Sequence, residues 1–365
     1  NGNTLDFKIT LLPGDGIGPE VVQQAVRVMD VIASRNSHTF QYTERLMGGC
    51  SIDKYGTSLT DETLADCQAA DAVLLGAVGG PKWDDPNAKD RPERGLLALR
   101  KGLGVYANMR PIKVHPSLLD ASPLKAERLQ GVDILILREL TGGLYFGQPK
   151  KREMRAEGEW AVDTLEYYDF EIRRIVQLAF DLAKRRKKKV MSVDKANVLE
   201  SSRLWRQIAT QIGAENPDVK LEHQLVDSAA MKLITGPAWM DVIVTENMFG
   251  DILTDEGSVL AGSMGMLPSA SLSEAGAGFS PEAGVKGLYE PIHGSAPDIA
   301  GQGIANPIGA ILSAALLLRY SLKLEREAQC LEQAVDDAIT NRARTADLGG
   351  SLNTGQMTDE IIEFL

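Results

Sequence analysis

The sequence has few cysteines and lacks any long apolar segment. Its three cysteines, Cys50, Cys67 and Cys330, are widely spaced and odd in number. They form no CxxC pair and no disulfide framework, which fits a reducing, cytoplasmic location. No apolar run approaches the ~18 residues that a membrane-spanning helix needs. The longest run, residues 308–318, is expected to form a buried helix, and the N-terminal residues lack the pattern of a secretion signal.

The chain also lacks an excess of positive charge. Its formal net charge of −11 argues against nucleic acid as the main partner. An anionic small-molecule substrate would therefore need a local basic pocket. The longest basic run, residues 184–189, follows a predicted amphipathic helix, where cations interact favourably with the helix dipole. We interpret it as a solvent-exposed helix end rather than a targeting signal.

What the chain does have is length, apolar residues and glycine. A chain of 365 residues exceeds one ordinary hydrophobic core, so we expect two domains or one elaborated α/β domain. A hydrophobic content of 44% and 35 glycines indicate a globular protein with many tight turns. We find no internal repeat and no low-complexity segment.

Short buried strands alternate with helical segments, which is typical of a parallel sheet covered by helices. We expect strands at residues 5–12, 71–76, 134–137, 190–193, 221–226 and 242–244, and helices at 20–33, 94–103, 168–186, 308–320, 325–344 and 358–365. Residues 140–167 are polar and lack helical periodicity, so they are expected to be a functional excursion or an oligomerisation arm. Residues 287–298 contain too many chain-breaking residues for an ordinary element.

Two glycine-rich loops follow predicted strands, at residues 14–20 and 76–80. Glycines between a strand and a helix favour a close approach of the backbone to an anionic ligand or a nucleotide. The first loop reads G-x-G-x-G rather than the G-x-G-x-x-G dinucleotide fingerprint, and no acidic residue follows at the expected offset. A purely structural turn therefore remains an equal alternative, and a Rossmann fold is not indicated.

Polar side chains recur where predicted strands end, at Arg138, Lys195 and Asp227 and in the turn before Asp251. Ligands of open α/β sheets gather at these carboxyl ends. A lysine in such a place can be a general base when burial or neighbouring cations lower its pKa, or it can simply pair with an acid. Arg138 together with Arg100 and Arg110 could clamp a carboxylate, although each could also be a surface charge.

Asp251 and Asp255 lie four residues apart on a predicted helix, so both carboxylates face the same side. Two like charges so close raise each other's pKa, and a divalent cation would relieve that repulsion. Mg²⁺ takes carboxylate oxygens and leaves positions open for a substrate. The alternative is two acids near the start of a helix, where the dipole favours them.

Four separated motifs make these features specific. They are Gly14-Asp15-Gly16-Ile17-Gly18-Pro19-Glu20, Asp194-Lys195-Ala196-Asn197-Val198, the stretch from Asn247 to Asp255, and His293-Gly294-Ser295-Ala296-Pro297-Asp298. In this order they resemble the β-decarboxylating dehydrogenases, the isocitrate/isopropylmalate dehydrogenase family, nearly from end to end. The resemblance implies an enzyme that oxidises and decarboxylates a 2-hydroxy acid.

The same resemblance implies a fold and an assembly. The fold would be isopropylmalate/isocitrate dehydrogenase-like, with two α/β domains and a mixed sheet, and not a Rossmann fold. A discontinuous cofactor-binding domain would comprise residues 1–105 and 262–365, and a substrate and dimerisation domain residues 106–261. Residues 140–167 would form an intersubunit arm of a homodimer with shared active sites. Lys195 and Asp227 would reach the site of the neighbouring subunit.

The segment 92–101, PERGLLALRK, resembles the branch of the family that acts on 3-isopropylmalate in leucine biosynthesis. Leu96 and Leu97 offer an apolar wall for an isopropyl group, and Glu93 would repel the additional carboxylate of isocitrate. The product would be 2-oxo-4-methylpentanoate with CO₂. Arg94 lies beside the position where homoisocitrate enzymes carry an arginine, so homoisocitrate, tartrate and malate remain alternatives.

Residue roles follow from the resemblance. It implies catalytic roles for Lys195, Tyr145 and Asp227, substrate binding by Glu93, Leu96, Leu97, Arg100, Arg110, Arg138, Val198 and Asp227, and binding of Mg²⁺ or Mn²⁺ by Asp227, Asp251 and Asp255. The NAD site would comprise Ile17, Gly76, Ala77, Val78, Asn197, Glu290, His293, Gly294, Ser295, Ala296, Pro297, Asp298 and Asn306. The carboxylate of Asp298 would accept a hydrogen bond from a ribose hydroxyl and repel a 2′-phosphate, which favours NAD over NADP.

Two rival classes use fewer of these residues. A Mg²⁺-dependent phosphoryl-transfer enzyme could use Asp251, Asp255 and the glycine loops, but the chain lacks a Walker A lysine motif. A non-catalytic nucleotide-binding protein would leave Lys195, Tyr145 and the arginines without a role.

Overall fold

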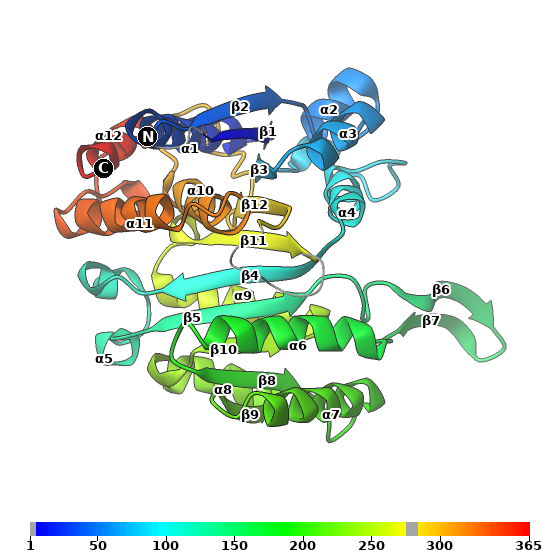
Figure 1. The fold of residues 1–365 in the computed structure, drawn as a ribbon. Helices are drawn as coiled ribbons and strands as arrows, with labels where there is room; N and C mark the ends of the chain where they lie inside the picture. Colours follow the sequence, from blue (N-terminus) through cyan, green and yellow to red (C-terminus); the bar gives the residue numbers. More distant parts are fainter. Residues whose placement is uncertain (1–4, 275–283) are drawn as a thin grey trace. The chain divides into compact units, whose positions relative to one another are not determined.

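The computed structural model describes residues 5–274 and 284–365, which divide into two units (Figure 1). Unit 1 comprises Asn1–Val105, His115–Pro123 and Ala261–Leu365, and unit 2 comprises Tyr106–Val114 and Leu124–Leu260. Within each unit the strands pair in both parallel and antiparallel directions, and helices pack on them. The α/β class and the two α/β domains with mixed sheet that the sequence predicts are therefore confirmed.

In unit 1 the strands are β1 (Asp6–Gly14), β2 (Thr39–Glu44), β3 (Ala72–Ala77), β11 (Pro268–Ser273) and β12 (Gly287–Pro291). They lie in the order β2-β1-β3-β12-β11, and β11 is antiparallel to β12 while the other pairs are parallel. The order differs from the 3-2-1-4-5-6 arrangement of a Rossmann domain. This agrees with the poor dinucleotide fingerprint of the first loop.

The helices of unit 1 are α1 (Gly18–Asn36), α2 (Gly49–Tyr55), α3 (Asp61–Ala69), α4 (Pro92–Leu103), α10 (Ile308–Tyr320), α11 (Glu325–Thr340) and α12 (Thr354–Glu363). Helix α10 is apolar on almost every side because it packs between α1, α11 and the strands β11 and β12. The buried helix expected at residues 308–320 is thus confirmed. Among the described residues, no helix is both long and apolar enough to cross a membrane.

In unit 2 the strands β4 (Val105–Lys113), β5 (Asp133–Glu139), β8 (Lys189–Asp194), β9 (Lys220–Leu225) and β10 (Val242–Thr245) lie in the order β4-β5-β10-β8-β9. Only β4 runs antiparallel to its neighbour in this group. Helices α6 (Asp169–Ala183) and α7 (Glu200–Glu215) cover one face, and α8 (Val226–Thr235) and α9 (Asn247–Ser258) cover the other (Figure 1). The carboxyl ends of β5, β10, β8 and β9 therefore share one edge.

The remaining elements are short or separate. The predicted excursion at 140–167 contains a two-stranded antiparallel hairpin, β6 (Gly147–Arg155) with β7 (Gly158–Thr164). Short helical segments complete the fold: α5 (Ala126–Leu129) and the 3₁₀ turns Pro81–Trp83, Pro116–Ala121, Pro237–Trp239, Val259–Ala261, Met264–Met266 and Ala346–Leu348.

Several sequence expectations were wrong in detail. The segment 287–298 does contain an element, because β12 pairs with β3 and β11 despite Gly287 and Pro291 at its ends. Asp227 lies in the first turn of α8 rather than at a strand end, since Leu225 already has the extended conformation of an N-cap. Helix α11 ends at Thr340, not at 344, and α12 begins at Thr354, not at 358.

The basic run after α6 is only partly a solvated helix end. Helix α6 ends at Ala183 and the chain turns at Lys188, which has a φ of 58°. Within the run, Arg186 donates to Asp241 at 2.8 Å and to Asp133 at 3.0 Å. Asp241 is buried, so this guanidinium balances a buried carboxylate and anchors the start of β10.

Candidate active site

Five of the predicted residues in unit 2 lie around helix α9, where Asp251 is hydrogen-bonded to two of them and Asp255 is ion-paired with a third. Arg138 is the second-last residue of β5, beside β10, and its Nη1 donates to Asp251 Oδ1 at 3.1 Å. Tyr145 donates its hydroxyl to Asp251 Oδ2 at 2.8 Å. Arg110 extends from β4, and its Nη1 lies 3.7 Å from Asp255 Oδ1. Arg110 lies inside that strand.

The cluster combines buried positive charge, which favours an anion, with partly exposed negative charge, which favours a cation. The side chains of Arg110 and Arg138 are largely buried, whereas Asp251 is 40% and Asp255 69% exposed. Burial, and then the hydrogen bond to Asp251, raise the pKa of Tyr145 to about 12. The hydroxyl of Tyr145 is therefore protonated at neutral pH and can donate a proton.

Lys195 and Asp227 form a second pair in unit 2. Lys195 follows β8 and Asp227 follows β9, and these strands run parallel with Asp194 paired to Leu225. Lys195 Nζ lies 3.0 Å from Asp227 Oδ1, and this hydrogen bond is the main cause that lowers the pKa of Asp227. The backbone before Lys195 is fixed by the buried Asp194, which Arg206 binds with two nitrogens at 2.9 Å each.

The acidic residues fit a hard divalent cation only in part. Asp251 and Asp255 present carboxylate oxygens from one face of α9, which are the donors that Mg²⁺ and Mn²⁺ prefer. Within residues 5–274 and 284–365, no three acidic, histidine or cysteine side chains gather closely enough to hold a metal. One chain thus offers two of the three predicted ligands together, and Asp227 is not among them.

In unit 1 two predicted cofactor segments, the end of β3 and the segment after β12, pack against the first glycine loop. Asp15 N donates to Ala77 O at 2.8 Å, and Ile17 N donates to Ser295 O at 2.8 Å. Gly16 has a φ of 60°, and a Cβ there would lie 2.0 Å from Ser295 O. The loop, the end of β3 and the segment after β12 are therefore packed backbone against backbone, which only glycine permits.

Asp15 organises this region, although the sequence analysis gave it no role. Its buried carboxylate accepts hydrogen bonds from the backbone N–H groups of Gly49, Cys50 and Gly79, each at 2.8 Å. One side chain thus ties the first glycine loop to the start of α2 and to the second glycine loop. The only signal in the sequence was its place between two glycines.

Buried polar atoms near these segments support a ligand. His293 Nε2 and Glu290 Oε2 have no hydrogen-bond partner among the described residues. Burial lowers the pKa of His293, so its imidazole is neutral near pH 7. Arg100 Nη2 lies 3.5 Å from Glu290 Oε1. Unsatisfied buried polar atoms are rare in proteins, and a nucleotide would supply partners for them.

The remaining predicted residues either bond within the chain or are partly or fully exposed. Asn306 bonds within its own chain, because its Oδ1 accepts from Ile308 N at 3.0 Å and its Nδ2 donates to Asp347 Oδ2 at 3.0 Å. Leu97 is exposed and Leu96 half-buried on α4, where Glu93 is also exposed. The predicted residues that stand exposed near their loops are Asn197, Val198, Gly294, Pro297 and Asp298.

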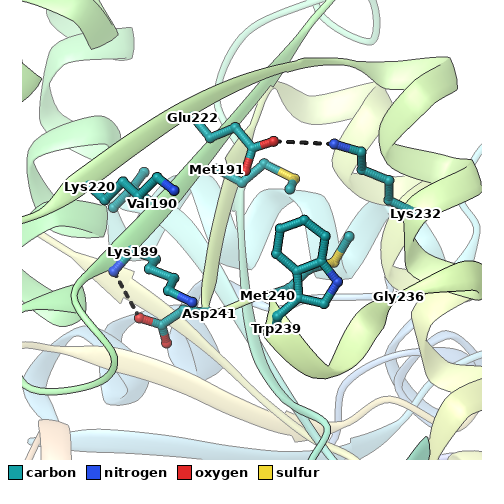
Figure 2. Close-up of a pocket in the computed structure, with 10 residues that line it drawn as sticks. All are labelled: Lys189, Val190, Met191, Lys220, Glu222, Lys232, Gly236, Trp239, Met240 and Asp241. Carbon is teal, nitrogen blue, oxygen red and sulfur yellow. Dashed lines mark hydrogen bonds and ion pairs between the residues drawn. The ribbon is translucent and has the colours of Figure 1, made fainter. Parts of the chain in front are cut away.

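A small cavity in unit 2 lies away from these residues. It is lined by residues such as Lys189, Lys220 and Trp239, at the amino ends of β8 and β9 (Figure 2). Lys195 and Asp227 follow the opposite, carboxyl ends of the same strands. The cavity contains none of the predicted site residues, and we assign it no part in catalysis.

Comparison with known proteins identifies the class. The fold is similar to that of a β-decarboxylating dehydrogenase from Thermococcus kodakarensis, with a TM-score of 0.78 and 37% identity over 98% of this chain and 96% of that one. It is also similar to isocitrate dehydrogenase from Methylococcus capsulatus, with a TM-score of 0.82 and 32% identity over 98% of this chain and 99% of that one.

The family follows from the sequence matches. The model of the isocitrate/isopropylmalate dehydrogenase family matches residues 8–362, and the chain belongs to that family. It is 70% identical to 3-isopropylmalate dehydrogenase of Anaeromyxobacter dehalogenans over 99% of this chain and all of that protein. It is 57% identical to 3-isopropylmalate dehydrogenase of Bacillus subtilis over 97% of this chain and 96% of that protein. The resemblance inferred from the four motifs is confirmed.

Proposed function

We propose that the protein oxidises and decarboxylates (2R,3S)-3-isopropylmalate to 2-oxo-4-methylpentanoate and CO₂, with reduction of NAD, in leucine biosynthesis. The observation that carries this proposal is the cluster of Arg110, Arg138, Tyr145, Asp251 and Asp255 in a chain 70% identical to a 3-isopropylmalate dehydrogenase. The guanidinium groups would bind carboxylates, the tyrosine would donate a proton and the two aspartates would bind a metal; Asp251 is hydrogen-bonded to Arg138 and Tyr145, and Asp255 is ion-paired with Arg110.

Substrate binding would use charge for the malate part and apolar contact for the isopropyl group. Arg110 and Arg138 have most of their surface buried, so their guanidinium groups are preorganised to bind carboxylates, and Arg100 would join them. Leu96 and Leu97 of α4 would contact the isopropyl group, and the adjacent Glu93 would repel a further carboxylate. Val198 would add apolar contact.

Proton transfers would be carried out by side chains of unit 2. Lys195 would take the proton from the 2-hydroxyl, with Asp227 orienting its Nζ. Tyr145 would return a proton to C3 after loss of CO₂, since its hydroxyl is protonated and fixed by Asp251. When bound, Mg²⁺ or Mn²⁺ would polarise the 2-oxygen and stabilise enolate charge, and NAD would accept the hydride from C2.

The NAD site would be formed by the loops around Asp15 together with the segment after β12. The backbone of Ile17, Ala77 and Ser295 is already joined there, and Gly76 and Val78 flank it. His293 and Glu290 bring buried polar atoms that a nucleotide can satisfy. The remaining predicted contacts are Asn197, Gly294, Ala296, Pro297, Asp298 and Asn306, and the carboxylate of Asp298 would select against a 2′-phosphate.

A homodimer would complete the metal site. Asp227 pairs with Lys195 and is not grouped with Asp251 and Asp255 in one chain, so a third ligand from a second chain would resolve the shortage. Helices α8 and α9 expose large apolar side chains, among them Met231, Ile234 and Ile252. Exposed apolar patches of this kind mark protein interfaces. The hairpin β6–β7 would be the intersubunit arm. The predicted location of the enzyme is the cytoplasm.

One assay tests the activity. Formation of NADH is followed with Mn²⁺ and 3-isopropylmalate, isocitrate, homoisocitrate, tartrate or malate in turn. We expect brisk turnover of 3-isopropylmalate with NAD and much slower turnover with NADP. Brisk turnover of another acid, with none of 3-isopropylmalate, would refute the proposal and favour that acid.

Mixing inactive variants tests the shared sites. Lys195→Met and Asp251→Asn proteins are unfolded together and refolded. In mixed dimers one of the two sites would receive only intact residues, so about a quarter of the wild-type activity should return. If each site belongs to a single chain, the mixture stays inactive.

A further inference from the structure

Glu139 is a buried carboxylate at the end of β5 that the proposed chemistry does not use. It is 0% exposed and follows Arg138 directly. Its two oxygens point at the turn that leads to Tyr145. Thr141 N donates to Oε1 and Oε2 at 2.5 and 2.8 Å, and Gly142 N donates to Oε1 at 2.6 Å. Buried N–H groups need acceptors, so the shape of this turn depends on the carboxylate.

The other side of the same turn is bound by Asn247, the first residue of α9. Asn247 is buried, and its Nδ2 donates to Gly142 O at 3.1 Å and to Leu140 O at 3.4 Å. Its Oδ1 accepts from Arg138 Nε at 3.0 Å. Glu139 thus satisfies the N–H groups of the turn, and Asn247 satisfies its carbonyl groups.

This arrangement closes a ring of contacts around the proposed proton donor. From Asn247 the ring continues through Arg138 to Asp251, and Asp251 accepts the hydroxyl of Tyr145. Tyr145 is three residues beyond Gly142. Its side chain is partly exposed, so its position is set mainly by this hydrogen bond and by the turn before it.

We propose that Glu139 is a positioning residue, which holds the Thr141–Gly142 turn so that Tyr145 stays in place to return a proton to the substrate. The proposal rests on the function proposed above, in which Tyr145 is the proton donor. Glu139 touches neither substrate nor cofactor in it. Its contribution is geometric, comparable to that of residues that orient a catalytic group without contacting the substrate.

The charges around Glu139 come from several elements. Glu171 of α6 lies on the far side of Thr141, whose Oγ1 is 3.3 Å from Glu171 Oε2. Arg174 of α6 donates to the same Oγ1 at 2.9 Å and lies over the ring of Tyr106 on β4. Burial raises the pKa of Glu139 to about 7, against the lowering effect of the N–H donors. Those donors favour the ionised form, which accepts all of them.

Two substitutions at this position separate shape from acceptor capacity. Glu139→Met keeps the length of the side chain but removes both acceptors, and Glu139→Gln keeps one oxygen. We expect kcat for 3-isopropylmalate to fall about 10- to 100-fold in Glu139→Met and about 3- to 10-fold in Glu139→Gln, with KM changed less than about threefold. Glu166→Gln, at an exposed glutamate of the same segment, is the matched control and should behave as wild type.

A double-mutant cycle with Tyr145→Phe shows whether Glu139 acts through Tyr145. If it does, Glu139→Met should lower kcat much less in the Tyr145→Phe background than in wild type. An equal loss in both backgrounds would overturn the proposal. If Glu139→Met does not fold, Thr141→Val removes the exposed side chain's hydroxyl, which donates to Glu139 Oε1 at 3.0 Å, and should still lower kcat. Unchanged kcat in both Thr141→Val and Glu139→Gln would also overturn the proposal.

A measurement independent of turnover separates this proposal from the proposed function. Amide hydrogen exchange of residues 140–147 should be slow in wild type and in Glu166→Gln and at least about tenfold faster in Glu139→Met. Fast exchange in wild type would refute the anchoring role whatever the substrate is. If exchange behaves as expected but 3-isopropylmalate is not turned over, only the proposed function fails.

Discussion

Lys195 Nζ lies 3.0 Å from Asp227 Oδ1, although the two residues are 32 positions apart and follow different strands. The parallel pairing of β8 with β9 brings them together, because Asp194 and Leu225 are register partners at the strand ends. Asp227 is fully ionised at neutral pH, since its hydrogen bond from Lys195 lowers its pKa. The two residues therefore form an ion pair at the surface of unit 2, in which Asp227 fixes the position of the Lys195 Nζ.

Replacement of Lys195 by methionine tests its role as the base. Lys195→Met keeps the length of the side chain but cannot accept a proton, so kcat should fall about 10²- to 10⁴-fold. NAD binding, measured by calorimetry, should change little because all the proposed NAD contacts except Asn197 lie in unit 1. Lys220→Met, on the start of β9, is the matched control. Turnover close to wild type would remove Lys195 as the base.

The proposed metal ligands can be tested by the demand for Mn²⁺. Asp251→Asn and Asp255→Asn each replace one carboxylate oxygen by an amide NH₂ group, which removes a negative charge and one oxygen ligand. We expect the half-saturating concentration of Mn²⁺ to rise about 10- to 100-fold in each, measured by turnover and by electron spin resonance of bound Mn²⁺. Glu256→Gln changes a neighbouring acid of α9 and should leave Mn²⁺ binding unaltered. Unchanged Mn²⁺ binding in both aspartate variants would contradict the assignment.

Substrate preference should depend on Leu97, which is 47% exposed on α4. An apolar side chain so exposed has room to gain contact with an isopropyl group. Leu97→Ala should lower kcat/KM for 3-isopropylmalate by about 1–3 kcal/mol, or roughly 5- to 150-fold, and leave that for malate nearly unchanged. Lys101→Ala, exposed on the same helix, should affect neither. Equal losses for both acids would show that Leu97 does not discriminate between them.

Glu139 should make stability depend on pH in a defined direction. Its pKa is about 7 in the folded protein and 4.5 in a model compound, so between these values the folded state holds a proton that the unfolded state has lost. Stability from this group is therefore complete below about pH 4.5 and is lost as the pH rises through about 7. The loss at pH 8 is on the order of 3 kcal/mol.

Glu139→Gln removes that titration. Compared with wild type, its free energy of unfolding in urea should improve as the pH is raised from 5 to 8, by an amount approaching that figure. Glu166→Gln provides the control for the loss of one exposed carboxylate. A pH-independent difference between wild type and Glu139→Gln would show that the carboxyl is not perturbed by burial.

Local pattern predicted the longer apolar elements and placed Arg138 and Lys195 near strand ends, but it did not predict β2, β4, β11 or α7. Helix α10 has the bounds expected from its apolar run after Pro307, because a continuous apolar run can be recognised in the sequence without knowledge of the elements that pack around it. Strand β12 was missed, since five residues bounded by Gly287 and Pro291 become a strand only through pairing on both sides. Asp15 and Glu139 were missed for a similar reason: their partners are backbone N–H groups, which leave no mark in the sequence.

Asp15 provides the last test, because one side chain holds three loop segments of unit 1. Asp15→Asn keeps the shape but turns an amide N–H₂ toward N–H donors of Gly49, Cys50 or Gly79. Leaving a buried donor unsatisfied costs about 1–3 kcal/mol, which should appear as a lower midpoint of thermal unfolding. Since the glycine loop is proposed to contact NAD, the dissociation constant for NAD should also rise at least about fivefold, measured by calorimetry. Asp6→Asn, at an exposed position of β1, is the control. A variant of Asp15 that loses stability but binds NAD as wild type does would limit Asp15 to a structural role.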